Sequence, residues 1–179
     1  MTIRIPTMQR RLASFTLLLG IACLLAACGF QLRGSGGTSA ALPDSWKKMY
    51  LVTNNPNSEF TRAVVTVFTT NDILWTARND ANYLLQLGPE RFKKTNLSLN
   101  KEARVSQLEL TMQSTFSIVG ANGEEAMPDT VASVIRRMDN DPRNEQGMGE
   151  EVRILKSEMR TELAQQIVRR IGFFATTGP

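Results

Sequence analysis

Residues 108–118 alternate in polarity, and this pattern limits the possible folds more than any other feature of the chain. The apolar parity consists of Leu108, Leu110, Met112, Phe116 and Ile118. The polar parity consists of Glu109, Thr111, Gln113, Thr115 and Ser117. Successive side chains of a strand point to opposite faces, so the pattern predicts an antiparallel strand with one buried and one solvated face. A sheet that is apolar on one face needs a second layer to cover it.

Two segments have the spacing of helices that could form this layer. Residues 150–173 place an apolar side chain every three or four positions, with Glu150 and Glu151 at the start and Arg169 and Arg170 near the end. This charge arrangement suits the helix dipole, and Gly172 is predicted to cap the helix. Residues 57–71 follow a turn signal and carry a second apolar stripe, which predicts a shorter helix.

Three further segments are predicted to be strands. They are residues 49–53, residues 83–99 with an interruption at Pro89, and residues 130–138. The predicted order is therefore β-α-β-β-β-α. Two helices on one face of a mostly antiparallel four-stranded sheet make a two-layer α+β sandwich.

The N-terminal residues have the pattern of a secretory signal peptide. Residues 1–11 contain three arginines and no acidic residue, and residues 12–27 carry no charge. A helix of this uncharged run would rise about 24 Å, short of the ~30 Å hydrocarbon core. The predicted organisation is a signal peptide over 1–27, a Gly/Ser-rich flexible tether over 28–45, and one α+β domain over 46–179.

Composition excludes several classes of function. The chain has no histidine, and its two cysteines are Cys23 and Cys28, so the predicted domain contains neither residue type. Ser-His-Asp and Cys-His catalysis are therefore excluded, and no metal or other cofactor is expected. Without the arginines of residues 1–27, 18 basic side chains face 17 acidic ones, which argues against nucleic-acid binding.

The end of the uncharged run resembles a bacterial lipobox. Leu25-Ala26-Ala27-Cys28 places two small residues directly before a cysteine. The resemblance implies that Cys28 carries an N-acyl chain and an S-diacylglycerol, which together anchor a protein stably. Gly29, in a position where Asp tends to retain lipoproteins in the inner membrane, implies the outer membrane. The alternative is ordinary cleavage beside an incidental cysteine.

Several motifs along the chain resemble one family, the LPS-assembly lipoprotein LptE (RlpB) family. They are Cys28-Gly-Phe-Gln-Leu-Arg-Gly34, Phe60-Thr-Arg-Ala-Val64, Asn140-Asp-Pro142, Ser157-Glu-Met159 and Ala164-Gln-Gln-Ile-Val-Arg-Arg-Ile171. The resemblance implies the same two-layer fold, no enzymatic activity, and a position in the lumen of the outer-membrane β-barrel LptD, about one-to-one. It also implies that the protein plugs the barrel, helps to assemble it, and binds lipopolysaccharide on its way to the outer leaflet. The alternative is a free-standing lipoprotein, on the periplasmic side, that carries an amphiphile without a barrel.

Lipopolysaccharide carries phosphorylated sugars, so its binding requires Lys or Arg. The densest basic cluster is Arg91, Lys93 and Lys94. Residues 91 and 93 share a strand face about 6.6–7 Å apart, a spacing at which one phosphate could lie between them. The alternative is a strand edge kept basic to prevent pairing.

Arg136 and Arg137 are the second candidates for lipopolysaccharide binding. On a regular strand they point to opposite faces, so they are not expected to form one site together. Arg160, Arg169 and Arg170 are interpreted instead as part of the exposed face of the long helix, where they complement Glu158 and Glu162.

Overall fold

The computed structural model describes residues 42–99, 101, 105–141 and 144–177. Cys28, the predicted signal peptide and residues 28–41 of the predicted tether lie outside the described residues. Among the described residues, no helix is long and apolar enough to cross a membrane.

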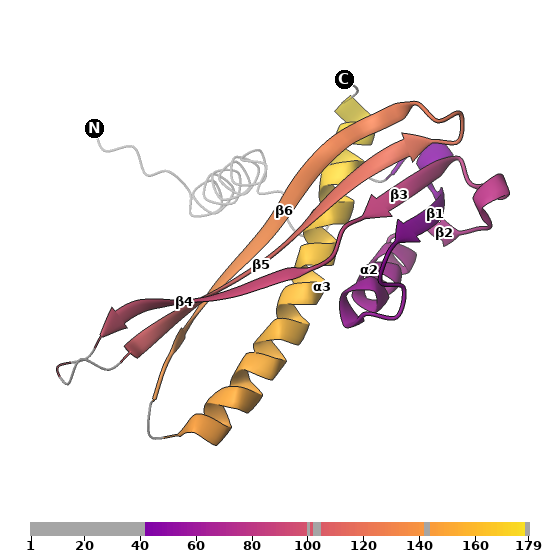
Figure 1. The fold of residues 1–179 in the computed structure, drawn as a ribbon. Coiled ribbons are helices and arrows are strands. Elements are labelled where there is room, and N and C mark those ends of the chain that lie inside the picture. The colour runs from indigo at the N-terminus through magenta and orange to yellow at the C-terminus, as the bar shows by residue number, and fades with distance from the viewer. Residues whose placement is uncertain (1–41, 100, 102–104, 142–143, 178–179) are drawn as a thin grey trace, which may run out of the picture. The chain divides into compact units, whose positions relative to one another are not determined.

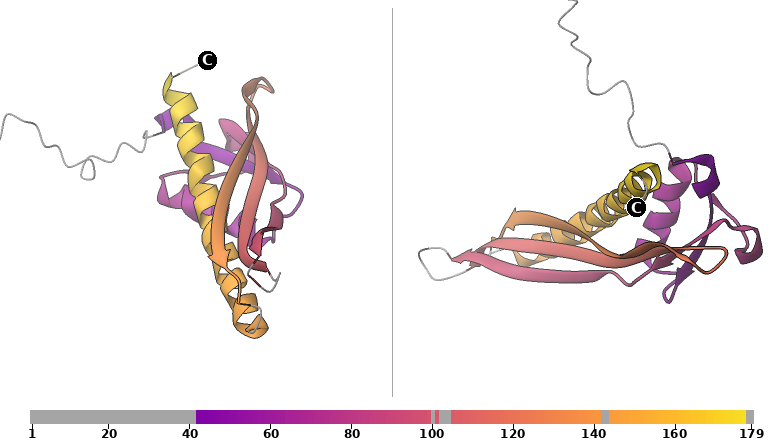
Figure 2. Two further views of the ribbon diagram at one scale, coloured as in Figure 1. Left: turned by 90° about the vertical axis from the view of Figure 1, so that its left-hand side faces the viewer. Right: turned by 90° about the horizontal axis from the view of Figure 1, so that it is seen from above.

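The described elements are two helices, a six-stranded sheet and two short 3-10 helices. In chain order they are η1 (Asp44–Trp46), β1 (Lys48–Thr53), α2 (Glu59–Thr70), β2 (Leu74–Trp75), η2 (Arg78–Asp80), β3 (Tyr83–Leu87), β4 (Arg91–Leu99), β5 (Val105–Gly120), β6 (Glu125–Asp139) and α3 (Glu145–Thr177). Both helices lie on the same side of the sheet, and α3 runs along β5 and β6 (Figures 1 and 2). The predicted α+β architecture with one covered face is confirmed.

The sheet differs in detail from the predicted four strands. The two-residue β2 pairs in parallel with β1, and β1 pairs in parallel with β3, so the sheet is mixed. β3 and β4 pair with successive halves of β5, and β6 pairs with its other edge, all antiparallel. The prediction failed because β2 is too short to leave a periodic pattern, and because residues 88–90 divide the predicted strand 83–99 in two.

α3 is longer than predicted at both ends. It begins at Glu145 and continues through Gly172 to Thr177. Gly172 therefore does not cap the helix. The continuation is stabilised by Phe174 and Ala175, which pack against the core, and the ring of Phe174 contacts that of Trp46 edge-on at 6.5 Å between centroids.

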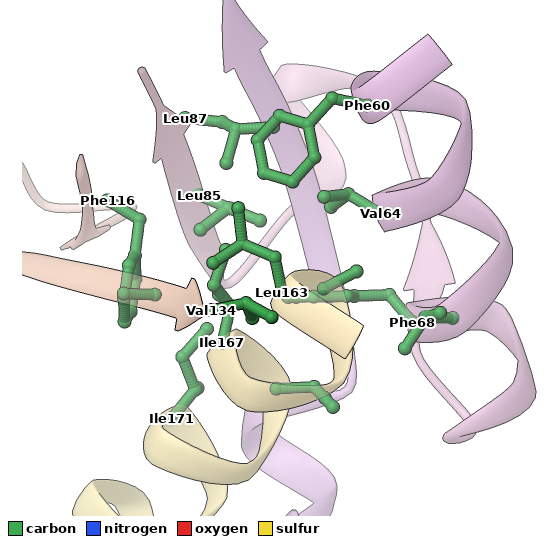
Figure 3. Packing of buried hydrophobic residues seen from close by; sticks show 14 of the residues in the cluster. Phe60, Val64, Phe68, Leu85, Leu87, Phe116, Val134, Leu163, Ile167 and Ile171 are labelled. Atoms are coloured by element: carbon green, nitrogen blue, oxygen red, sulfur yellow. The ribbon is translucent and has the colours of Figure 1, made fainter. Parts of the chain in front are cut away.

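The start of α2 is fixed by a hydrogen-bonded cap. The Ser58 side-chain oxygen accepts from the Thr61 amide at 3.0 Å, as N-cap serines do. The buried Thr61 hydroxyl in turn donates to the Asn55 carbonyl at 2.8 Å. The cap directs the apolar stripe of Phe60, Val64 and Phe68 toward α3 and the sheet (Figure 3).

The core lies between the two helices and one face of the sheet, called here the helix face. β3 and β5 contribute Leu85, Leu87, Phe116 and Ile118, while α3 contributes Leu163, Ile167 and Ile171 (Figure 3). Leu42 is also buried, with 7% of its surface exposed, although the tether is predicted to extend to residue 45. The described core therefore includes a residue of the predicted tether.

The break between β3 and β4 depends on a close approach of two backbones. The Gly88 amide donates to the Thr115 carbonyl at 2.8 Å, and the Ser114 hydroxyl donates to the Gly88 carbonyl at 2.9 Å. A Cβ at position 88 would lie 2.9 Å from that Thr115 oxygen. Only glycine fits here without displacing the backbone of β5.

Gly88→Ala is accordingly expected to lower the free energy of unfolding by about 1–3 kcal/mol, measured by urea denaturation. Gly149→Ala is the matched control, because a Cβ at this helical position meets nothing within 4 Å. It should leave stability unchanged or raise it by up to about 1 kcal/mol. Equal effects of the two substitutions would contradict the proposed role of the close approach.

Candidate functional site

The face of the sheet opposite the helices, called here the open face, gathers basic side chains from two strands. In the β4–β5 register Arg91 lies beside Gln113 and Lys93 beside Thr111, whereas Phe92 lies beside the buried Met112. Arg91 and Lys93 therefore share the open face, as the sequence predicts. Both side chains are exposed, and neither has a salt-bridge partner among the described residues.

β6 adds one further cation to the open face. Arg137 pairs with Glu109 across the β5–β6 ladder, and its Nε lies 3.6 Å from the Glu109 carboxylate. Arg137 is thus partly neutralised, while its side chain remains 74% exposed. Arg137 therefore lies at the margin of the candidate site formed by Arg91 and Lys93, and it can contribute only there.

The remaining two candidates lie on the helix face. Lys94 is opposite the fully buried Leu110 in β5, and Arg136 is opposite the same residue from β6. Arg136 forms an ion pair with Glu162 of α3. The structure therefore divides the five predicted basic residues between the two faces, with Arg136 and Arg137 on opposite faces as the sequence predicts.

The open face also carries exposed apolar side chains, a feature that the sequence pattern did not indicate. Val131 and Ile135 of β6 are 53% and 54% exposed on the open face. Ile135 and Lys93 flank Thr111 from opposite sides, so they lie two strand spacings apart, ~10 Å. Their spacing of four residues within the predicted strand 130–138 could have indicated that they share a face, but not that Ile135 lies level with Lys93. This face can contact phosphate and hydrocarbon at the same time.

The hollow between α2 and α3 is also lined by basic residues, but their charges are engaged. Arg62 donates to the Asn57 carbonyl at 2.8 Å, and Arg153 pairs with Glu150 of its own helix. Lys156 lies over the Phe92 ring, 4.8 Å from its centroid. This hollow is a weaker candidate for an anion than the open face.

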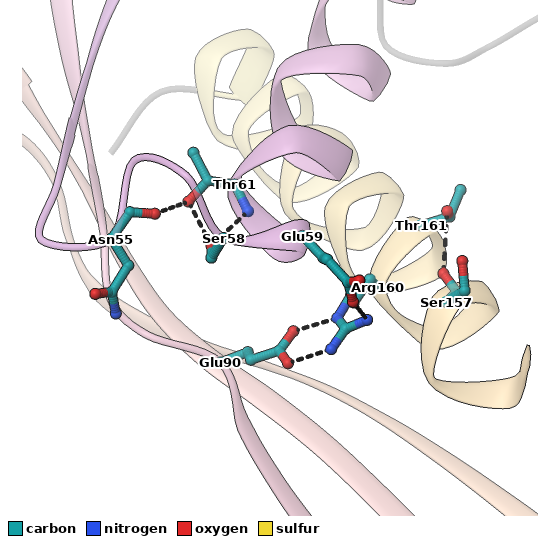
Figure 4. A network of polar contacts seen from close by, with 8 residues as sticks. All are labelled: Asn55, Ser58, Glu59, Thr61, Glu90, Ser157, Arg160 and Thr161. Atoms are coloured by element: carbon teal, nitrogen blue, oxygen red, sulfur yellow. Dashed lines mark hydrogen bonds and ion pairs between the residues drawn. The ribbon is translucent and has the colours of Figure 1, made fainter. Parts of the chain in front are cut away.

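Arg160, which also lines the hollow, connects three elements. Its Nε and one terminal nitrogen each donate to a different Glu90 oxygen at 2.7 Å, and its other terminal nitrogen donates to Glu59 (Figure 4). Glu59 begins α2, and Glu90 directly precedes β4. The bonds to Glu90 raise the pKa of Arg160 above its ordinary value.

The predicted exposed role of the helix arginines is thus wrong for Arg160. Its side chain is only 13% exposed and reaches Glu90 and Glu59, and the predicted partner Glu162 pairs with Arg136. Arg170 is exposed as predicted, and it also donates to the Val131 carbonyl at 2.7 Å. Because these partners lie on other elements, no spacing within the helix could reveal them.

The described residues contain no group of three or more His, Cys, Asp or Glu side chains that could hold a metal ion. What the site offers is a pair of exposed cations, unpaired among the described residues, on the same sheet face as the exposed aliphatic side chain of Ile135. Such an arrangement is chemically suited to an anionic amphiphile.

Comparisons with known proteins place the chain in a family. The family model described as LptE, lipopolysaccharide-assembly, matches residues 46–171, so the chain belongs to the LptE family. The resemblance inferred from the motifs is confirmed. Members of this family are lipopolysaccharide-assembly lipoproteins and not enzymes, and the chain therefore has a role in lipopolysaccharide assembly in the cell envelope.

Relatives match most of the chain. The LPS-assembly lipoprotein LptE of Pectobacterium atrosepticum is 31% identical over 170 residues, which cover 92% of this chain and 86% of that protein. The protein of the same name from Yersinia pestis is 30% identical over 161 residues, 87% of this chain and 74% of its own length.

Solved structures share the fold. Rare lipoprotein B from Shewanella oneidensis superposes with a TM-score of 0.63 at 24% identity, covering 72% of this chain and 96% of its own. An uncharacterised lipoprotein B from Nitrosomonas europaea gives a TM-score of 0.67 at 21% identity, covering 84% and 94%.

Proposed function

We propose that the chain is anchored in the outer membrane by lipid on Cys28, occupies the lumen of the LptD β-barrel about one-to-one, and binds lipopolysaccharide on its open face. Family membership supports the barrel partner and the ligand. The lipobox-like residues before Cys28 support the anchor, and Gly29 supports the outer membrane. In this function the protein plugs and helps to assemble the barrel.

The observation that carries the binding proposal is the pair Arg91 and Lys93. Both are exposed and lie on one face, and among the described residues neither has an ion-pair partner. A phosphate lying between them would receive charge-assisted hydrogen bonds, which are the strong kind. The nearby Ile135 offers apolar contact to acyl chains or to the hydrocarbon parts of the sugar. Lys94 and Arg136 are assigned no direct part, because they lie on the helix face.

Arg91→Asp combined with Lys93→Asp is expected to weaken lipopolysaccharide binding by about 10–100-fold, because two favourable charges become repulsive. Binding is measured with the purified full-length protein and labelled lipopolysaccharide. Lys93→Asp and Lys94→Asp form a matched pair: they make the same change in the same strand, on opposite faces. If Lys94→Asp weakens binding as much as Lys93→Asp, the open face is not the site.

The barrel partner is tested by recovering the tagged, lipidated protein from detergent-solubilised outer membranes. A large β-barrel present near one-to-one, identified by mass spectrometry, is the expected result. Lipid without a barrel would favour the alternative function, in which a free-standing lipoprotein carries an amphiphile.

Cys28→Ser should abolish lipid attachment and leave the domain folded, because the core begins only at Leu42 among the described residues. Mass spectrometry reports the acylation, and circular dichroism with thermal melting reports the fold. A lower helical content in this variant would show that the anchor region contributes to folding.

A further inference from the structure

Glu90 places a negative charge directly before the two cations of the proposed site. It belongs to the short segment 88–90 between β3 and β4, so no strand pairing fixes its direction. Its side chain is 22% exposed and turns toward α3 (Figure 4). If the Glu90 carboxylate were free to turn, it could reach the guanidinium of Arg91, which is proposed to bind phosphate.

Arg160 binds both oxygens of the Glu90 carboxylate. The two bonds of 2.7 Å form a parallel fork, the strongest geometry available to an arginine and a carboxylate. The third bond, to Glu59, ties the same guanidinium to the first turn of α2. The guanidinium is therefore held by two elements besides its own helix.

We infer that Arg160 is a positioning residue for lipopolysaccharide binding: it keeps the Glu90 carboxylate on the helix face, so that Arg91 and Lys93 remain free for a phosphate. This inference rests on the proposed function, and it assigns to that function a residue on the opposite side of the sheet. Arg160 itself does not touch the ligand.

The physical argument is the cost of leaving Glu90 unpaired. Without Arg160 the carboxylate would be a largely buried charge with no partner, which is unfavourable. Turning toward solvent relieves this cost, and Arg91, the next residue in the chain, offers an exposed cation there. A carboxylate paired with Arg91 competes with the ligand phosphate for the same donors.

A purely structural role for Arg160 makes a different prediction. Removing a partly buried ion pair lowers stability whether or not a carboxylate remains. Changing Glu90 to Gln would then restore binding only as far as it restores stability, and stability recovers only in part, because Gln removes the unpaired charge but not the loss of the fork. Competition by the carboxylate predicts instead that Glu90→Gln rescues binding fully while stability stays below that of wild type.

The test compares Arg160→Met, Glu90→Gln and the double variant in the full-length lipidated protein. The affinity for purified lipopolysaccharide is measured alongside the midpoint of urea unfolding. Arg160→Met is expected to lower affinity about 5–10-fold, and the double variant to return within about twofold of wild type while remaining destabilised. Glu90→Gln alone should bind as wild type.

Arg153→Met is the matched control, since Arg153 lies on the same helix and pairs only with the nearby Glu150 in the described structure. It should bind as wild type. Lipopolysaccharide stripped of its phosphates serves as a second probe, against which Arg160→Met should lose no affinity relative to wild type. Arg160→Lys keeps a cation in place if the Met variant does not fold. It should lose about two- to threefold, and this loss should also be reversed by Glu90→Gln.

The inference is overturned if Arg160→Met binds as wild type, or if the double variant binds as weakly as the single one. Its failure is distinguishable from that of the proposed function. If the double variant Arg91→Asp with Lys93→Asp binds lipopolysaccharide normally, the proposed site is wrong. If that double variant binds weakly while Arg160→Met binds normally, only the positioning role of Arg160 is wrong.

Discussion

The pairing of β5 along both of its edges is the constraint on which the rest of the structure depends. One edge holds β3 and then β4, and the other holds β6. Because side chains alternate across the strand, a shift of one residue would exchange its two faces. The burial of Leu110, Met112 and Phe116 under the helices excludes such a shift, and the same register places Thr111 and Gln113 on the open face.

This register also decides the composition of the proposed site. Arg91 and Lys93 reach the open face because Phe92, between them, is opposite the buried Met112. Arg137 reaches it because it is opposite Glu109. The core therefore orients the binding residues without contacting them, and any substitution that disturbed the packing of β5 would disturb the site as well.

The divided strand joins the binding surface to the helix layer. Gly88 allows the chain to approach β5 closely, and Glu90 then meets Arg160 before β4 begins. Through Glu59 the same arginine reaches α2, whose stripe packs into the shared core. The basic strand is thus attached to both helices at the residue before its first cation. These contacts add support to the proposed binding surface, because β4 has a neighbouring strand on one side only.

The sequence by itself determined the elements whose pattern repeats over many residues. The alternation of 108–118 and the apolar stripe of 150–173 identified β5 and most of α3, and spacing alone placed Arg91 and Lys93 on one face. Local pattern did not determine the parallel pairing of β1, nor the two-residue β2, since pairing partners are chosen by tertiary packing. Only the tertiary structure brought Arg160 to Glu90, 70 residues earlier in the chain. A contact between distant segments leaves no periodic pattern in the sequence, because its two residues come together only after the chain has folded.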